Sequence, residues 1–286
     1  MDGTLDRRGL LKTTGAGALL ASLAVPARGA PADKPNGRIR QSICQWCYPK
    51  FSVPELAKHA KELGYTGLDL LTPEQFLQIK DSGLTCPMLA GVQGIGDCLN
   101  RRSQHDRVEK QFRRNIEFAA EHGLKNVICF SGNRKGMADD EGLAVCAEGL
   151  RRVLKFAEEK KVVLVMELLN SKVDHHDYQC DHTEWGVKLC KLLGSPNFKL
   201  LYDIYHMQIM EGDVIRTIKK HHEWIAHYHT GGNPGRHEID DSQELYYPAV
   251  MKAIAETGFQ GFVAQEFLPQ REPVASLAQA FKICDV

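Results

Sequence analysis

The sequence has no excess of charge of either sign, because 36 lysines and arginines balance 36 aspartates and glutamates. A neutral chain exerts no long-range attraction on polyanions, so nucleic acid is not an expected partner. The chain also lacks the GxGxxG and GxxxxGK[ST] motifs after its first predicted strand, so the sequence gives no indication of a nucleotide-binding site. It has no long linker, and its 286 residues are a normal length for a single α/β barrel preceded by a leader.

The uncharged stretch near the N-terminus is too short to span a bilayer. Thr13–Val25 has 13 residues, whereas a membrane-spanning helix needs about 20. The stretch follows the pair Arg7-Arg8 and precedes small residues at Ala27, Ala30 and Ala32, as in a twin-arginine signal peptide. We therefore predict a twin-arginine signal peptide and leader over residues 1–32, a barrel over 33–286, export to the periplasm and no stable membrane anchor.

The nine cysteines do not form the pattern of a disulfide framework, because their number is odd and their spacing irregular. Cys44 and Cys47 have CxxC spacing, but no second CxxC motif exists to complete a four-cysteine zinc site. We expect most of the cysteines to be buried, unreactive thiols.

From Arg38 onward, short apolar segments alternate with longer amphipathic ones, which is the pattern of repeated β–α units. The predicted strands are Ile39–Cys44, Gly67–Leu71, Leu84–Leu89, Asn126–Phe130, Val162–Glu167, Lys199–Asp203, Ile225–His229 and Gly261–Glu266. The predicted helices are Pro54–Leu63, Pro73–Ser82, Asp106–His122, Glu141–Lys160, Thr183–Leu193, Val214–Lys220, Pro248–Thr257 and Pro273–Lys282. Eight such units favour a single-domain α/β fold, a (β/α)8 TIM barrel, over an open doubly wound sheet.

Polar residues end the last four predicted strands: Glu167, Asp203, His229 and Glu266. In a barrel, the C-terminal ends of the strands meet at one mouth, where active sites lie. Three carboxylates would repel one another there without a cation. Oxygen-rich ligation with one imidazole suits Mn²⁺ or Mg²⁺, and Co²⁺ or Zn²⁺ also fit. Taken singly, each glutamate could instead be a surface group, and Asp203 could cap the following turn.

The motifs around these residues resemble those of the xylose-isomerase-like barrel superfamily. The segments Val165–Asn170, Tyr202–Met207, His227–His229 and Gln265–Phe267 carry the resemblance. Asn233–Glu238 resembles the PGRHE segment of the hydroxypyruvate isomerase family, which makes that family the nearest branch. The similarity extends over roughly residues 38–269.

The resemblance implies that Glu167, Asp203, His229 and Glu266 bind one divalent metal ion, with the two glutamates as the acid–base pair. It further implies that His206 contacts the substrate and that Arg236 binds a carboxylate or hydroxyl group. From the residues alone, Arg236 could equally be a surface residue of a glycine- and proline-rich loop. Trp46 could line the substrate pocket or pack at the barrel rim.

Two positions depart from the hydroxypyruvate isomerase pattern. That family usually carries Gln where His229 stands, whereas the related ketose 3-epimerases carry His and place a second Glu where this chain has Val173. We expect an isomerase that acts by enediolate proton transfer, converting hydroxypyruvate to tartronate semialdehyde. A ketose 3-epimerase, or a sugar or inosose dehydratase, is the alternative. The expected partner is a small carbohydrate or hydroxy-keto acid, and a homo-oligomer is compatible with the sequence.

Overall fold

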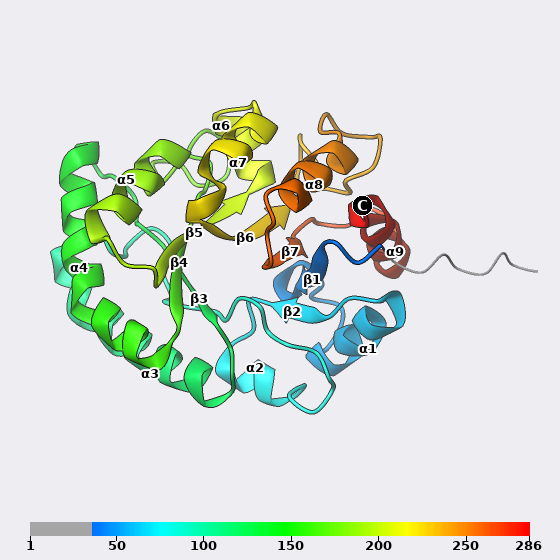
Figure 1. Ribbon diagram of the computed structural model, residues 1–286, viewed down its shortest axis with the longest axis horizontal. Helices are drawn as coiled ribbons and strands as arrows, with labels where there is room; N and C mark the ends of the chain where they lie inside the picture. The colour runs from blue at the N-terminus through cyan, green and yellow to red at the C-terminus, as the bar shows by residue number, and fades with distance from the viewer. Residues whose placement is uncertain (1–35) are drawn as a thin grey trace, which may run out of the picture. The chain divides into compact units, whose positions relative to one another are not determined.

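The computed structural model describes residues 36–286, which form one domain of parallel strands and surrounding helices (Figure 1). The predicted signal peptide of residues 1–32 lies outside the described residues and stays a prediction. The strands are β1 Arg40–Cys44, β2 Gly67–Asp69, β3 Asn126–Cys129, β4 Val163–Glu167, β5 Phe198–Asp203, β6 Ile225–Thr230 and β7 Phe262–Gln265. The helices are α1 Val53–Leu63, α2 Pro73–Leu77, α3 His105–Glu121, α4 Asp139–Lys160, α5 Thr183–Leu193, α6 Ile204–Met210, α7 Val214–His221, α8 Tyr247–Glu256 and α9 Pro273–Cys284.

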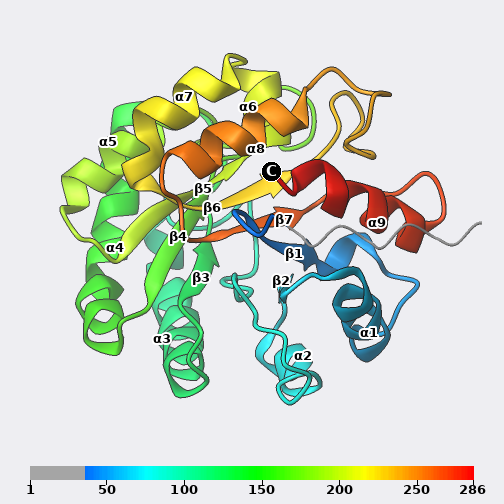
Figure 2. The same ribbon diagram turned by 45° about the vertical axis from the view of Figure 1, so that its right-hand side comes forward.

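The seven strands pair in parallel in the order β2-β1-β7-β6-β5-β4-β3. Figures 1 and 2 show the strands in the centre of the domain and the helices around them. Consecutive strands β3 to β7 are neighbours in the sheet, and β7 pairs with β1, as expected when a chain of β–α units closes on itself. The predicted single-domain TIM barrel is confirmed.

The gap between β2 and β3 is closed by the segment 84–89, which was predicted as a full strand but forms only isolated bridges. Thr85 pairs with Gly67, and Leu89 pairs with both Leu71 and Val127. Pro87 explains the interruption, because proline has no N–H to donate to a ladder. Gly67 allows the close approach, since a Cβ there would lie 2.7 Å from the Pro87 ring.

Two predicted helices differ from the observed ones. The segment Pro73–Ser82 is helical only to Leu77 and continues as tight turns, in which the N–H groups of Ile79 and Ser82 bond to carbonyls three residues earlier. Helix α6 was not predicted at all. Its sequence, IYHMQIM, is short and apolar, and it follows β5 with no intervening loop, so it offers no amphipathic period.

The nine cysteines are all free and buried, so the prediction of buried thiols is confirmed. Burial raises the pKa of the Cys44 thiol well above its ordinary value, which keeps it protonated at neutral pH. None of the helices between residues 36 and 286 has the length and apolar character needed to cross a bilayer.

The inside of the barrel holds a small aliphatic cluster of Met88, Ile128, Val165 and Leu201, separate from the larger core that contains the inner faces of the helices. Val165 and Leu201 lie two residues before the polar strand ends Glu167 and Asp203, so they share a strand face with them. The aliphatic cluster therefore forms the floor beneath the polar residues at the mouth.

Truncation of this floor should destabilise the barrel strongly. Leu201→Ala is expected to lower the free energy of unfolding by about 2–5 kcal/mol, because it removes fully buried methyl groups and leaves a cavity. Leu192→Ala, on an α5 side chain that is 44% exposed, should change it by less than about 0.5 kcal/mol. Denaturant unfolding followed by circular dichroism measures both, and similar losses in the two variants would contradict the assignment of Leu201 to the core.

Candidate active site

Four polar residues meet at the C-terminal ends of four neighbouring strands. Glu167 and Asp203 end β4 and β5, His229 is the penultimate residue of β6, and Glu266 directly follows β7. One ligand atom from each lies within 4.8 Å of those of the other three. All four side chains are buried. The strand-end pattern in the sequence therefore predicted the grouping that the structure shows, which we call the carboxylate–histidine cluster.

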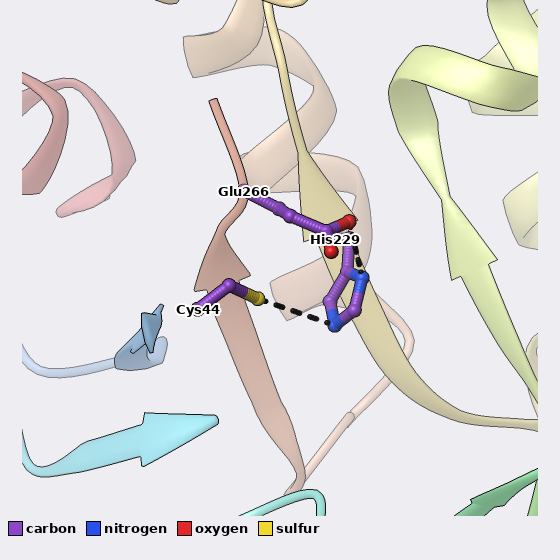
Figure 3. A group of neighbouring side chains, drawn as sticks. All are labelled: Cys44, His229 and Glu266. Carbon is purple, nitrogen blue, oxygen red and sulfur yellow. Dashed lines mark hydrogen bonds and ion pairs between the residues drawn. The ribbon is translucent and has the colours of Figure 1, made fainter. Parts of the chain in front are cut away.

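One nitrogen of the His229 imidazole faces both glutamates. Its Nδ1 atom is 2.7 Å from Glu266 Oε2 and 3.1 Å from Glu167 Oε1. Its Nε2 atom faces the opposite way, 3.7 Å from the Cys44 thiol, as Figure 3 shows. The ring is thus oriented so that one nitrogen points to the carboxylates and the other to the barrel interior.

Arg236 belongs to the cluster and is not a surface residue. Its Nη2 atom is 2.5 Å from Glu266 Oε2 and 3.3 Å from Asp203 Oδ2. The guanidinium also lies over the rings of Trp46 and Tyr205, at 5.2 Å and 5.3 Å from their centroids. Arg236 adopts a left-handed backbone conformation, with φ of 57°, and its carbonyl accepts a hydrogen bond from the Leu268 amide. The loop therefore directs a cation onto two of the three carboxylates.

The carboxylates differ in their electrostatic surroundings. Burial, reinforced by the charge of Glu266, raises the pKa of Glu167 above its usual value. Burial also raises the pKa of Asp203 well above its usual range, although Arg236 acts in the opposite direction. For Glu266, burial opposes ionisation, but Arg236 and His229 lower its pKa well below the usual range. Arg236 and His229 therefore stabilise the ionised form of Glu266. The ionised forms of Glu167 and Asp203 lack enough positive charge nearby to offset their burial.

The donor set fits a divalent metal ion. Three carboxylates and one imidazole are ligands that Mg²⁺, Mn²⁺ and Zn²⁺ accept, and a doubly charged ion would supply the missing positive charge. A further buried nitrogen, His206 Nε2, lies 3.7 Å from Asp203 Oδ2 and has no hydrogen-bond partner among the described residues. Such an atom at the edge of the cluster indicates that a polar ligand belongs there.

His206 is positioned by the start of α6. The Asp203 side chain accepts a hydrogen bond from the His206 amide at 3.1 Å, which caps the helix directly after β5. The Asn170 side-chain amide lies 2.6 Å from His206 Nδ1. Burial and the charge of Arg236 lower the pKa of His206 well below its ordinary value, so the ring is neutral. Because the Asn170 NH2 group donates to Nδ1, the neutral ring carries its proton on Nε2, which can donate to a substrate oxygen.

Trp46 forms part of the site wall. Its indole N–H donates to Glu266 Oε1 at 2.7 Å, and its side chain is 43% exposed. The same indole lines a cavity of about 440 Å³ bounded by the segments 47–51 and 268–271. The polar end of the ring contacts the cluster, whereas the lining of this cavity includes none of the four cluster residues.

Two polar residues that lie beside the cluster, Asp69 and His227, were not predicted from the sequence. Asp69 ends β2, but the predicted strand continued to Leu71 and so hid a polar strand end. His227 precedes His229 by two residues and therefore points to the same face of β6. The HxH pattern could have indicated His227, and a second predicted strand that ended at Asp69 could have indicated Asp69.

The polar loop of residues 174–177 is adjacent to His206. Asp174 accepts hydrogen bonds from Asn170 and Tyr205, and the His175 ring packs against His206 at 5.3 Å. Among residues 36–286, none of the groups able to bind a metal ion includes a residue of this loop. Its role here is to orient Asn170, Tyr205 and His206.

Comparison with known proteins identifies relatives along most of the chain. The family model described as "Xylose isomerase-like TIM barrel" matches residues 57–284. Hydroxypyruvate isomerase from Escherichia coli is 30% identical over 193 residues, covering 66% of this chain and 71% of that protein. The 2-oxo-tetronate isomerase from Cupriavidus necator is 30% identical over 165 residues, covering 57% of this chain and 63% of that protein.

Solved structures share the fold at lower identity. A family 2 AP endonuclease from Brucella melitensis has a TM-score of 0.73 at 23% identity, over 86% of this chain and 98% of that one. A D-psicose 3-epimerase has a TM-score of 0.67 at 16% identity, over 85% and 90%. The IOLI protein with a bound zinc atom has a TM-score of 0.67 at 15% identity, over 86% and 95%. The chain belongs to the xylose isomerase-like TIM barrel family, and hydroxypyruvate isomerase of E. coli is one of its homologues.

Proposed function

We propose that this protein is a metal-dependent isomerase of a small hydroxy-carbonyl compound, with hydroxypyruvate and tartronate semialdehyde as its substrate pair. The observation that carries the proposal is that Glu167, at the end of β4, and Glu266, directly after β7, both contact Nδ1 of His229, with Asp203 and Arg236 next to them. Two carboxylates that come from different strands and meet at one small site can remove and return a proton. The homologues named hydroxypyruvate isomerase and 2-oxo-tetronate isomerase support the same reaction class.

In the proposed reaction, one glutamate removes a proton from C3 of hydroxypyruvate. The electron pair of the C3–H bond forms the C2=C3 bond of an enediolate, and the other glutamate supports delivery of a proton to C2. The hydroxyl proton moves from O3 to O2, so that the aldehyde forms at C3. Substrate and product are isomers, and no oxidant or reductant is needed.

We propose that Glu167, Asp203, His229 and Glu266 bind one divalent ion, Mn²⁺ or Mg²⁺ in preference to Co²⁺ or Zn²⁺. When bound, such an ion polarises the carbonyl and hydroxyl oxygens of the substrate and stabilises negative charge on them. His206 supplies a neutral imidazole beside Asp203 for a substrate oxygen. Arg236 supplies a buried guanidinium that suits the carboxylate of a keto acid.

A ketose 3-epimerase and a sugar or inosose dehydratase are the competing functions. His229 favours the epimerase, because the related epimerases carry His at this position. Incubating the metal-loaded protein with hydroxypyruvate, 2-oxo-tetronate and a panel of ketoses, and identifying products by NMR, separates the three. An aldehyde product supports the proposed isomerase, an inverted C3 centre supports the epimerase, and a dehydrated product supports the lyase.

The residue at position 229 provides a test of specificity. His229→Gln replaces the imidazole with the group usual in hydroxypyruvate isomerases. We expect the ratio of kcat/KM for hydroxypyruvate to that for a ketose to rise by about 10-fold, since the change replaces a ring nitrogen with an amide oxygen of different reach in one proposed metal ligand. Steady-state kinetics on both substrates measures the ratio. An unchanged ratio in a folded, metal-binding variant would mean that His229 does not determine substrate choice.

We further propose that the protein is exported by the twin-arginine route to the periplasm. The support is the sequence of residues 7–32, with Arg7-Arg8, the uncharged stretch and the small residues that follow.

A further inference from the structure

A second group of polar side chains lies beside the carboxylate–histidine cluster: Cys44, Asp69 and His227. All three are fully buried. His227 pairs in register with Leu201, and His229 pairs with Asp203, so His227 is one layer farther from the mouth of the barrel. The imidazole Nε2 of His227 lies 2.5 Å from Asp69 Oδ2. The same Asp69 oxygen is 3.9 Å from His229 Nε2, on the side of that ring that faces away from the glutamates.

Burying the Asp69–His227 pair inside the barrel costs free energy of folding. His227 lies opposite Leu201 of β5, which belongs to the aliphatic cluster. Apolar side chains therefore fit this layer, and a buried carboxylate there loses its hydration. The hydrogen bond to His227 compensates Asp69 but does not explain why a carboxylate is present. The Asp69 carboxylate lies near enough to His229 to act on its imidazole through its charge.

The two nitrogens of His229 have different surroundings. Nδ1 faces Glu266 and Glu167, where the metal ion of the proposed function would bind. A neutral imidazole that binds a metal through Nδ1 must carry its proton on Nε2. In this structure Nε2 lies 3.7 Å from the Cys44 sulfur, which Figure 3 shows, and 3.9 Å from the Asp69 carboxylate.

We propose that Asp69, oriented by His227, is a positioning residue that favours the Nε2 proton of His229 and so presents Nδ1 to the metal ion. At 3.9 Å the carboxylate acts on the N–H through its negative charge, while the Cys44 sulfur is the nearer, weaker acceptor. Carboxylates that orient a metal-binding imidazole in this way contribute about 10- to 100-fold in metal affinity. The inference rests on the proposed metal site.

The alternative, that Asp69, His227 and His229 bind a second metal ion, does not fit the distances. Two ligand atoms that each lie about 2.0–2.2 Å from a tetrahedral ion are separated by more than 3 Å. Asp69 Oδ2 and His227 Nε2 are 2.5 Å apart, which is the length of a short hydrogen bond. The pair therefore acts on His229 and does not form a site of its own.

The test is the affinity of the full, chelator-stripped chain for Mn²⁺, measured by titration calorimetry. Asp69→Asn keeps the shape of the side chain and removes its charge, so we expect Mn²⁺ binding to weaken by about 10- to 100-fold. The matched control is Asp106→Asn, on an α3 side chain that is 91% exposed, which should change binding by less than about twofold. His227→Gln should weaken binding as well, and the double variant should match Asp69→Asn alone if His227 acts only through Asp69.

An NMR measurement of the wild-type chain does not depend on whether the variants fold. With Mg²⁺ or Zn²⁺ bound and histidine nitrogens labelled, the ring proton of His229 is expected on Nε2; a proton on Nδ1 would overturn the proposal. Unchanged Mn²⁺ affinity in a folded Asp69→Asn variant would also overturn it and would leave the proposed function standing. A wild-type chain that binds none of the four divalent ions would overturn both.

Discussion

Replacing Glu167 with glutamine is expected to reduce kcat by about 10²- to 10⁴-fold, the usual contribution of a positioned acid or base. The substitution preserves the size of the side chain and its hydrogen-bonding oxygen but removes the group that accepts the proton. The same loss is expected for Glu266→Gln, because both glutamates reach the same nitrogen of His229 and, in the proposed reaction, both are needed for a complete transfer. Steady-state kinetics with saturating metal measures the effect.

The control is the same chemical change at Glu148, which lies on α4, is half exposed and pairs with Arg102 on the surface. Glu148→Gln should leave kcat within about twofold of wild type, since an exposed ion pair contributes little. Thermal unfolding establishes that each variant is folded. Wild-type turnover by a folded Glu167→Gln variant would remove this glutamate from the proton transfer.

Arg236→Gln is expected to lower the melting temperature of the metal-free protein by about 6–20 °C. Breaking a buried ion pair costs about 3–5 kcal/mol, and a domain of this size loses about 2–4 °C per kcal/mol. The reason is that Arg236 contacts both Glu266 and Asp203, and its removal leaves buried carboxylates without a neighbouring guanidinium. Saturating Mn²⁺ should recover most of the loss, because binding to the folded state stabilises it.

Differential scanning calorimetry with chelator and with Mn²⁺ measures both parts of this prediction. Arg102→Gln, which removes the exposed partner of Glu148, should shift the melting temperature by no more than about 4 °C. Equal melting temperatures for wild type and Arg236→Gln in chelator would show that Arg236 does not compensate the cluster.

The sequence predicted the barrel because its alternation of apolar and amphipathic segments is regular. Helix α5 begins and ends at the predicted residues, Thr183 and Leu193, since its apolar period is clear and Gly194 follows in a left-handed conformation. The segment 84–89 was the exception among the strands. Its apolar composition favours a strand, but the backbone of Pro87 cannot complete the hydrogen-bond ladder.

The cluster could be predicted because parallel strands in a barrel end at the same mouth, so that order along the chain becomes proximity in space. Trp46 and Arg236 could not be assigned from periodicity, because both lie outside the regular strands and reach the site from short connecting segments. Their positions depend on the left-handed backbone at Arg236 and on the contact between the indole N–H and Glu266.

Asp69 and His227 were missed for a different reason. A buried polar pair in the barrel interior contradicts the expectation that inward-facing strand residues are apolar, so composition alone favours a surface or strand-end role for such residues. Recognising the pair requires knowing that β1 lies beside β2 and that β7 separates β1 from β6, which is information about the whole sheet.

The measurement that tests the central claim most directly is the metal-dependent exchange of substrate hydrogen with solvent. The chain is stripped with chelator, Mn²⁺, Mg²⁺, Co²⁺ or Zn²⁺ is returned, and deuterium entering hydroxypyruvate from D2O is followed by NMR. We predict exchange at C3 that requires a divalent ion and disappears in Glu167→Gln and Glu266→Gln. Exchange that persists at the same rate in chelator, or in either glutamine variant, would contradict the account.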